Sequence, residues 1–460
     1  MKKTGFILAL AALIGIAPLA FANGLNLNSL GTRALTMGGA FVALADDFSA
    51  VYWNPAGLAK FTSKAFGLYG TDILPSGTYK LTIPSSWPYL PLVSPGGPTP
   101  VDTKTQKKNY FGGMGTYIHP INEKLVAAIS VYTPSGLGAS WDGSQLAFVS
   151  GGNPGIDWMS KIGLLTIAPA LAYKVNDRLS LGAALNVNYG MFDIKMHAGK
   201  ADISPALLQF DLGQYEESDT GWGVGATFGI IYKATDTTSF GLTVRTPSTV
   251  SFSGTAKIAN LPTLNLPGSS SVDRKVTWPL WIALGMSVHP SDKFTFNIDA
   301  QYTKWSTIDK LEADYQDTVW ATLMATRATP YSEPKSVVPM RWGDGLQLRF
   351  GAEYMLTKAL AIRAGYYSDP SPAPDGTLNI LLPSFDFSVV TFGLGYSFGS
   401  LKIDAGIEYL SGAERDILFL RTFRHPQIPN PLFDYNYERA MPGTYNMKIV
   451  VPNISISYKF

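Results

Sequence analysis

The segment FTFNIDAQYTKW, residues Phe294 to Trp305, carries apolar and polar side chains in alternation. Its even-numbered positions are apolar up to Tyr302, and its odd-numbered positions are polar from Thr295 to Thr303. A period of two is typical of a β-strand whose two faces meet different surroundings. We therefore predict a strand here with one apolar and one polar face.

The same alternation recurs along the chain, in Leu179–Gly190, in Leu401–Tyr409 and in the C-terminal NISISYKF of Asn453–Phe460. Tyrosines stand near the ends of these segments, at positions 189, 302, 409 and 458. A soluble β-sandwich also alternates, but long strands with aromatic ends are typical of a membrane barrel with interfacial girdles. A closed barrel leaves no unpaired sheet edge in lipid.

The joins between candidate strands alternate between short and long. The short joins are predicted at roughly 119–124, 174–178, 233–238, 289–293, 356–359 and 398–400. The long joins are predicted at roughly 73–107, 134–161, 191–220, 249–273, 306–345, 370–387 and 412–446. Short periplasmic turns and long external loops are typical of antiparallel outer-membrane barrels. The sequence thus predicts an all-β fold, an antiparallel transmembrane β-barrel of about 14 strands.

Composition agrees with export to a membrane. Residues 1–22 have a basic start, an apolar stretch over Gly5–Leu19 and an Ala20-Phe21-Ala22 cleavage pattern, which predict a signal peptide. Only 15% of residues are charged and 12% are aromatic, which is a low charge and a high aromatic content for a soluble exported protein. Composition alone leaves a large soluble β protein and an outer-membrane barrel open, and the alternation decides between them. The chain has no cysteine, so disulfides and thiolate metal sites are excluded. A net charge of +2 gives no basic footprint for nucleic acid.

Catalysis is poorly supported. The chain has four histidines, at positions 119, 197, 289 and 425, and all are predicted in or beside turns and loops. The stretch GYSFG, Gly395 to Gly399, matches a hydrolase pattern that requires a strand-to-helix elbow, but Ser397 is predicted on a strand before a tight turn. We expect no enzyme, no metal site and no cofactor; a lipid-modifying barrel enzyme remains an alternative.

Loops and lumen suggest an apolar ligand. Apolar side chains are frequent in the predicted loops, at 73–98, 140–148, 317–325 and 380–387, where they either collect apolar molecules or pack on one another. The polar strand faces carry Asp299, Glu353, Asp404 and Glu408 together with Arg245, Arg349 and Arg363. These charges predict a salt-bridged lumen, or an arginine that binds a ligand carboxylate. The three arginines are therefore the ligand-binding candidates.

Several longer stretches resemble one family. They are GGAFVALADDFSAVYWNPAGLA (38–59), TVSFSGTAK (249–257), WPLWIALGMSVHPSDKFTFNIDAQYTKWS (278–306) and RAGYYSDPSPAPDGTLNILLPSFD (363–386). In this order and spacing they resemble the FadL outer-membrane transporters of long-chain fatty acids and their aromatic-hydrocarbon relatives such as TodX. The resemblance covers nearly the whole mature chain.

The resemblance implies a fourteen-stranded barrel (63–460) with long extracellular loops and an N-terminal hatch (23–62) inside it. Asn54, Pro55 and Ala56 match the family's hatch signature, and Asp46 and Asp47 match its acidic pair. Gly38, Gly39 and their neighbours would let this irregular segment pack closely against the wall.

The resemblance also implies uptake of hydrophobic ligands, by ligand-gated hatch movement and lateral release at an inward kink of the third strand (123–133). Ala127 and Ala128 stand there, where relatives often carry glycine. Long-chain fatty acids are the predicted ligands; aromatic hydrocarbons taken up by the same route, or a general porin function, are the alternatives. The expected partners besides the ligand are outer-membrane lipid and, during biogenesis, the barrel-assembly machinery, and the protein is expected to be a monomer.

Overall fold

A computed structural model describes residues 24–86, 97–202, 209–326, 333–418 and 440–460. The predicted signal peptide (1–22) and His425 lie outside these residues. None of the helices in the described part of the chain is long and apolar enough to span a membrane.

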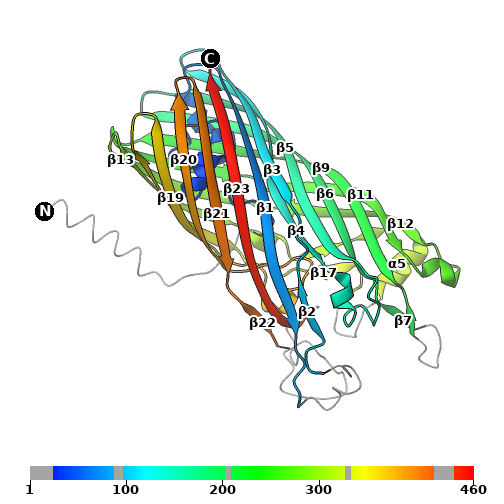
Figure 1. Cartoon of the computed structure of the whole chain (residues 1–460). Helices are drawn as coiled ribbons and strands as arrows, with labels where there is room; N and C mark the ends of the chain where they lie inside the picture. The colour runs from blue at the N-terminus through cyan, green and yellow to red at the C-terminus, as the bar shows by residue number, and fades with distance from the viewer. Residues whose placement is uncertain (1–23, 87–96, 203–208, 327–332, 419–439) are drawn as a thin grey trace.

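Fourteen antiparallel wall strands close a barrel, in which β1 pairs with both β3 and β23 (Figure 1). Two of them are interrupted, since β10 continues into β11 and β12 into β13. The wall consists of β1 (Ala65–Leu81), β3 (Tyr110–Pro120), β4 (Leu125–Trp141), β5 (Trp158–Lys174), β6 (Leu179–His197), β9 (Gln214–Lys233), β10 (Thr238–Arg245) with β11 (Ser248–Ile258), β12 (Ser269–Trp278) with β13 (Trp281–Ser291), β14 (Phe294–Thr303), β18 (Gly345–Met355), β19 (Leu360–Asp369), β20 (Phe387–Phe398), β21 (Leu401–Gly412) and β23 (Gly443–Lys459). The predicted fold class is confirmed.

Burial along the wall is the reverse of that in a soluble protein. On β14, the outward Phe296 is 46% exposed, whereas the inward Asp299 is 1% exposed. Ile454, Ile456 and Tyr458 on β23 are likewise exposed outward. Apolar side chains face outward because the barrel surface meets hydrocarbon, and polar side chains pair inside.

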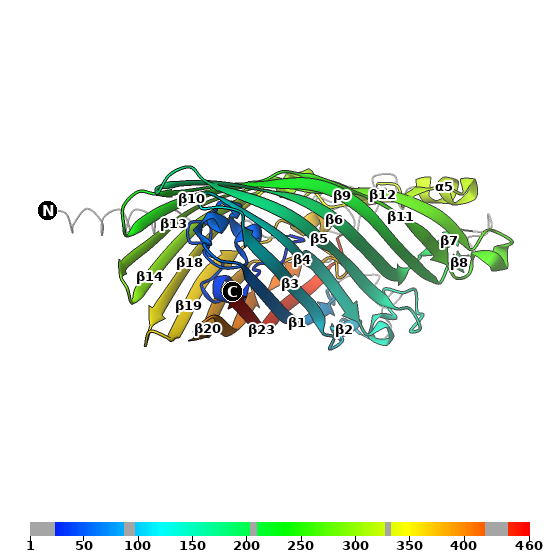
Figure 2. The same cartoon turned by 90° about the horizontal axis from the view of Figure 1, so that it is seen from above.

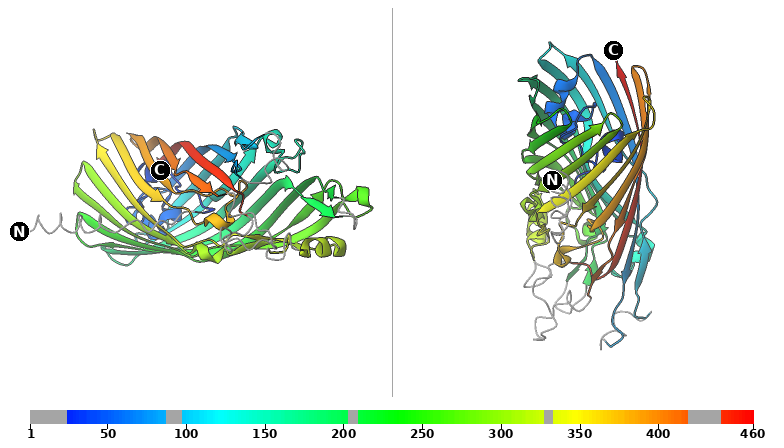
Figure 3. Two further views of the ribbon diagram at one scale, coloured as in Figure 1. Left: turned by 90° about the horizontal axis from the view of Figure 1, so that it is seen from below. Right: turned by 90° about the vertical axis from the view of Figure 1, so that its left-hand side faces the viewer.

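The strands are longer than predicted at the long-loop end, and the loops there are shorter. β1 extends to Leu81, β9 begins at Gln214, and β11 and β12 form a hairpin over most of the predicted 249–273 join. On β11 the outward side chains Thr249, Ser251 and Lys257 are polar. The predicted loop bounds were wrong because the sheet continues beyond the lipid, where apolar outward residues are no longer needed. Figures 1 and 3 show this extension, with helix α5 beside it.

The remaining elements pack at the long-loop end. They are β2 (Val101–Lys104), β7 (Lys200–Asp202), β8 (Gln209–Asp211), β15 (Lys310–Glu312), β16 (Asp314–Tyr315), α5 (Thr318–Ala325), β17 (Val337–Pro339) and β22 (Arg415–Ile417), with 3-10 turns at Gly143–Leu146, Leu261–Leu264, Trp305–Thr307 and Asp375–Thr377. Trp305, Trp320 and Ile380 are fully buried in one apolar core, and the Trp141 Nε1 of β4 donates to Ile380 O at 2.8 Å. Of the two alternatives for the apolar loops, the structure favours packing on one another.

The N-terminal segment, residues 24–64, lies inside the barrel and is called the plug below (Figure 2). It contains α2 (Thr32–Thr36), α3 (Ala50–Trp53) and the 3-10 helix η1 (Pro55–Lys60). Phe41, Trp53 and Asn54 are at most 1% exposed. Irregular backbone is thus surrounded by protein at membrane depth, where lipid could not satisfy it. The division of the chain at residue 62 stays a prediction.

Candidate ligand-binding and gating site

Glycines of the wall form a seat for plug helix α2. Gly393 of β20 pairs in register with Gly406 of β21, and Gly351 of β18 pairs with Gly365 of β19. A Cβ atom added at Gly393 would collide with the Thr36 side chain, and one at Gly365 would collide with plug backbone at Gly38. The seat therefore allows plug backbone to approach the wall more closely than any side chain would permit.

The predicted signature Asn54-Pro55-Ala56 is seated on a second pair of wall glycines, Gly182 and Gly229. Asn54 Nδ2 donates to Val42 O at 2.9 Å and to Ile230 O at 3.0 Å, while its Oδ1 accepts from Ala56 N at 3.1 Å. Asn54 is extended, as the following proline requires. Asn54 thus joins two parts of the plug to the wall; its role in gating stays a prediction.

Polar wall residues bind the turn between α2 and Val42. Asp299 Oδ2 accepts from the backbone N–H groups of Phe41 and Val42 at 2.8 and 3.0 Å. Asn297 Nδ2 donates to Ala40 O at 2.7 Å, and Gln301 Nε2 donates to Gly39 O at 3.1 Å. The buried backbone of an irregular turn is satisfied in this way. The alternation placed these three side chains in the lumen, but it could not identify their partners.

An ion-pair network connects the plug to the wall. Arg33 of α2 pairs with Asp46 and, at 2.8 Å, with Glu353 of β18. Arg363 of β19 then joins Glu353 to Asp404 of β21, at 2.6 and 2.7 Å. Sequence reasoning found the wall members but missed Arg33, since a single arginine in a plug has no sequence signature.

The two residues of the predicted acidic pair, Asp46 and Asp47, make different contacts. Asp46 belongs to the ion-pair network through Arg33. Asp47 instead accepts hydrogen bonds from the backbone N–H and the hydroxyl of Ser49, at 2.8 and 2.5 Å. Asp47 therefore stabilises the turn that precedes α3, and only Asp46 connects the plug with the wall network.

The three candidate arginines differ in their surroundings. Arg363 is held by two carboxylates, and Arg349 donates to Gln347 Oε1 at 2.8 Å and to Gly38 O at 3.0 Å. Arg245 lies between the rings of Tyr52 and Trp281, at 4.4 and 4.8 Å from their centroids. It also lines a small lumenal cavity of about 40 Å³ with Asn186 and Asn188. Arg245 is thus the candidate that borders a cavity in the lumen; ligand binding by any of the three stays a prediction.

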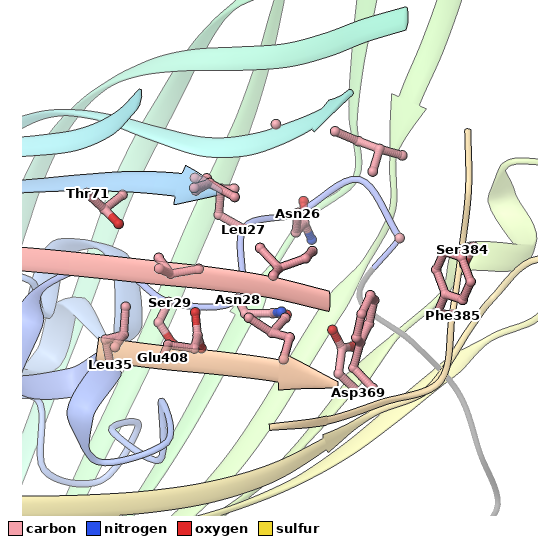
Figure 4. A pocket seen from close by; sticks show the side chains of 18 of the residues that line it. Asn26, Leu27, Asn28, Ser29, Leu35, Thr71, Asp369, Ser384, Phe385 and Glu408 are labelled. Atoms are coloured by element: carbon pink, nitrogen blue, oxygen red, sulfur yellow. The ribbon is translucent and has the colours of Figure 1, made fainter. Parts of the chain in front are cut away.

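A larger cavity of about 120 Å³ lies between the plug and the long-loop end (Figure 4). Its apolar lining includes Leu35, Leu137 and Phe385. Its polar lining includes Ser29, Tyr69, Asp369 and Glu408, which come from the plug, β1, β19 and β21. Among these, only Glu408 was singled out from the sequence.

Strand β4 is irregular beside this cavity. Ala127 and Ala128 pair regularly with β3 and β5, so they do not form the kink that the resemblance places in this strand. The register shift lies instead between Tyr132 and Ser135, at Pro134, which has no N–H for a sheet ladder.

The plug pairs with β4 at this irregularity. β3 pairs with β4 only up to Met114–Tyr132 among the described residues. Beyond that point, Asn26 of the plug forms a β-bridge with Ser135. Leu27 N donates to Pro134 O at 2.9 Å, and Gly136 N donates to Leu25 O at 3.1 Å. The first plug residues therefore form backbone hydrogen bonds with the part of β4 that does not pair with β3.

Comparisons with known proteins agree with this architecture. The crystal structure of a Pseudomonas aeruginosa FadL homologue superposes with a TM-score of 0.72 at 18% identity, covering 95% of this chain and all of that one. The Pseudomonas putida toluene transporter TodX gives a TM-score of 0.68 at 15% identity, covering 95% of this chain and all of that one. These likenesses show the fold.

Sequence comparison shows the family. Outer membrane protein P1 of Haemophilus influenzae is 24% identical over 403 residues, covering 80% of this chain and 82% of that protein. The profile of a family described as outer membrane protein transport protein (OMPP1/FadL/TodX) matches residues 13–460. Proteins of this family are transport channels and not enzymes, so the prediction that this chain is no enzyme is confirmed. The chain belongs to the OMPP1/FadL/TodX family of outer membrane transporters for hydrophobic compounds.

Proposed function

We propose that this protein takes up compact hydrophobic molecules, of about the size of one substituted aromatic ring, across the outer membrane. The size of the larger cavity, about 120 Å³, carries this proposal. An apolar cavity of about 150 Å³ is known to hold benzene, whereas an extended long-chain fatty acid is several times larger. The structural neighbour from Pseudomonas putida is described as a toluene transporter, which is consistent with a ligand of this size.

The proposed route runs from the apolar core of the long-loop end into the larger cavity. Burial of each CH₂ group stabilises a ligand there by about 0.8 kcal/mol relative to water, which favours its transfer from the aqueous phase into the cavity. Release requires the first plug residues to leave β4 at Ser135. The ligand then moves sideways into lipid between β3 and β4. No nucleotide is involved, because the ligand's own gradient drives the movement.

Uptake measurements test this proposal. A Gram-negative host that expresses the protein should accumulate radiolabelled toluene several-fold faster than the same host without it, and should accumulate oleate at the host's own rate. Faster uptake of oleate but not of toluene would contradict the proposal. A large, steady ion conductance of the purified protein in planar bilayers would indicate a general porin instead.

Long-chain fatty acids remain a second candidate, which the position of Arg245 favours. Its guanidinium borders the small lumenal cavity, so it could pair with a carboxylate there. If fatty acids are carried, Arg245→Gln should slow oleate uptake about tenfold or more, as expected for a lost charge-assisted bond. Toluene uptake by the same variant is the control, since Arg245 also donates to Tyr52 O of the plug. An equal loss for both ligands would assign Arg245 to the plug alone.

A further inference from the structure

We infer that the larger cavity selects ligands whose single polar group donates a hydrogen bond, such as a hydroxyl or an amine on an apolar ring, and that it excludes carboxylates. This inference rests on the proposed uptake of ring-sized molecules and adds the chemistry of their polar group. It depends on three features of the described cavity lining, which are its carboxylates, its hydroxyls and the absence of a cation among those residues.

Two carboxylates line the cavity. Glu408 of β21 is 3% exposed, and its Oε1 accepts from the Tyr367 hydroxyl at 2.5 Å. Asp369 of β19 is 5% exposed, and its Oδ1 accepts from Gln347 Nε2 at 2.6 Å. An ionised carboxylate only accepts hydrogen bonds and has about four accepting positions. Among the described residues, Glu408 accepts a side-chain hydrogen bond from Tyr367 alone. Accepting positions therefore remain on this carboxylate for a hydrogen bond from a ligand.

Two hydroxyls for which the described part of the chain offers no partner line the same cavity. Ser29 Oγ of the plug and the Tyr69 hydroxyl of β1 belong to residues 4% and 5% exposed, and neither has a hydrogen-bond partner among the described residues. A buried hydroxyl without a partner is unfavourable, so a ligand that bonds to it is favoured. A hydroxyl both donates and accepts. An alcohol that donates its hydrogen bond to a carboxylate can therefore accept one from the hydroxyl of Ser29 or Tyr69.

No cationic side chain is among the described residues that line the cavity. The nearby Arg349 is 1% exposed, is occupied by Gln347 and Gly38 O, and lies 4.1 Å from the centroid of the Tyr367 ring. A ligand carboxylate would therefore enter beside two acidic side chains and lose its hydration without gaining a counter-charge, which is strongly unfavourable. A hydroxyl or an ammonium group would instead meet acceptors. Figure 4 shows Asp369, Glu408 and Ser29 around this space.

Four probes that share one ring test this inference: toluene, benzyl alcohol, benzylamine and benzoate. Their binding to the full-length protein in nanodiscs is measured by titration calorimetry at neutral pH, with empty nanodiscs subtracted. Benzyl alcohol and benzylamine should bind about tenfold more tightly than toluene, as expected for a hydrogen bond to a charged group, and benzoate should bind most weakly.

Two variants connect this ranking to the cavity. Tyr69→Phe and Ser29→Ala remove hydroxyls that have no partner among the described residues, so neither change breaks a side-chain bond found there. Both should weaken benzyl alcohol binding several-fold and leave toluene binding unchanged. Tyr79→Phe is the matched control, because the hydroxyl of Tyr79 donates to Pro442 O at 2.8 Å and Tyr79 does not line the cavity.

The outcomes separate the two proposals. If toluene binds as tightly as benzyl alcohol, or benzoate binds most tightly, the selection of donors is overturned while uptake of ring-sized molecules stands. An unchanged probe ranking in both Tyr69→Phe and Ser29→Ala would overturn the assignment to this cavity. If none of the four probes binds, both the selection and the proposed uptake are overturned.

Discussion

Asn54 shows how one side chain can hold the plug in place. It bonds to three backbone groups, of Val42, Ala56 and Ile230, in a space from which water is excluded. Asn54→Ala should weaken the plug's attachment by about 1–3 kcal/mol, because buried backbone groups lose their partner. We expect increased ion leakage in planar bilayers and faster amide exchange over residues 42–56, with normal barrel assembly. Asn260→Ala, which removes a bond to Asp211 O in a long-loop segment, is the control. Parental leakage and exchange in a folded Asn54→Ala protein would contradict this assignment.

A second prediction concerns Asp219, in the part of β9 that extends beyond the lipid. Burial, together with the adjacent Glu217, raises the pKa of Asp219 to about 8, although Arg274 opposes the shift. The folded protein therefore keeps a proton that the unfolded chain, with a carboxyl pKa near 4, has already lost. The stability of this extension should thus be full below about pH 4 and should fall as the pH rises from there through about 8.

Protease cleavage at the long-loop end measures this dependence. Cleavage should be several-fold faster at pH 9 than at pH 5 in the parent protein. Asp219→Asn should remove most of the difference, because an amide does not titrate. Asp273→Asn, on the outward face of the neighbouring β12, should keep the parental dependence. A pH dependence that is unchanged in Asp219→Asn would assign it to another group.

At the scale of elements, the glycine seat sets the distance between α2 and the wall. Gly393→Ala should force α2 away, since the new Cβ collides with the Thr36 side chain. Overpacking of this kind costs about 1–3 kcal/mol, and Thr36→Ala in the same chain should restore part of it. Gly70→Ala is the matched control, because a Cβ at that wall position meets no atom within 4 Å. Amide exchange of residues 32–38 measures the effect; equal exchange in both single variants would show that α2 does not depend on the seat.

Strand prediction succeeded where lipid imposed a pattern and failed where it did not. β14 and β23 could be predicted because their outward residues must be apolar and their inward residues polar. The hairpin β11–β12 was predicted as a loop because its outward residues, such as Ser251 and Lys257, are polar. The bulge at Pro134 was also missed, because the family resemblance had placed the kink of this strand near Ala127 and Ala128.

Site prediction was limited for another reason. The polar strand faces identified Asp299, Glu353 and Glu408 as lumenal, but their partners Phe41, Arg33 and Tyr367 come from distant parts of the chain. Alternation gives the side on which a residue lies and not the residue opposite to it. Ser29 and Tyr69 gave no signal, since an isolated hydroxyl in a sequence does not reveal whether it has a partner in the fold.

At the scale of the whole molecule, the plug and the third wall strand should act together in release. Asn26 and Ser135 form an antiparallel bridge, and the chain has no other cysteine to interfere with a pair introduced there. Directly opposed residues lie about 4.5–5.5 Å apart between Cα atoms, within the range that a disulfide spans. Asn26→Cys with Ser135→Cys should therefore lock the plug to β4 on oxidation. Ligand uptake should then fall at least several-fold and recover with reductant.

A second cysteine pair controls for the crosslink itself. Ser411 and Lys448 are opposed on β21 and β23, so Ser411→Cys with Lys448→Cys crosslinks the wall and leaves the plug free. Uptake by this variant should not respond to oxidation. If the oxidised Asn26–Ser135 variant transports at the parental rate, release does not require separation of the plug from β4.

The bonds between the plug and the wall also constrain how the molecule is made. Thr32 N donates to Ser455 Oγ at 3.0 Å across 423 positions of the chain, and Arg33 is paired with Glu353 inside the finished lumen. Transfer of these charged and polar groups through a lumen already closed would expose them to a low-dielectric passage without partners. We therefore expect the plug, which is synthesised first, to lack these partners until β23 is in place. The barrel then closes around the plug when β23 pairs with β1. During biogenesis, we expect the plug to be enclosed by the wall in this way and not inserted afterwards.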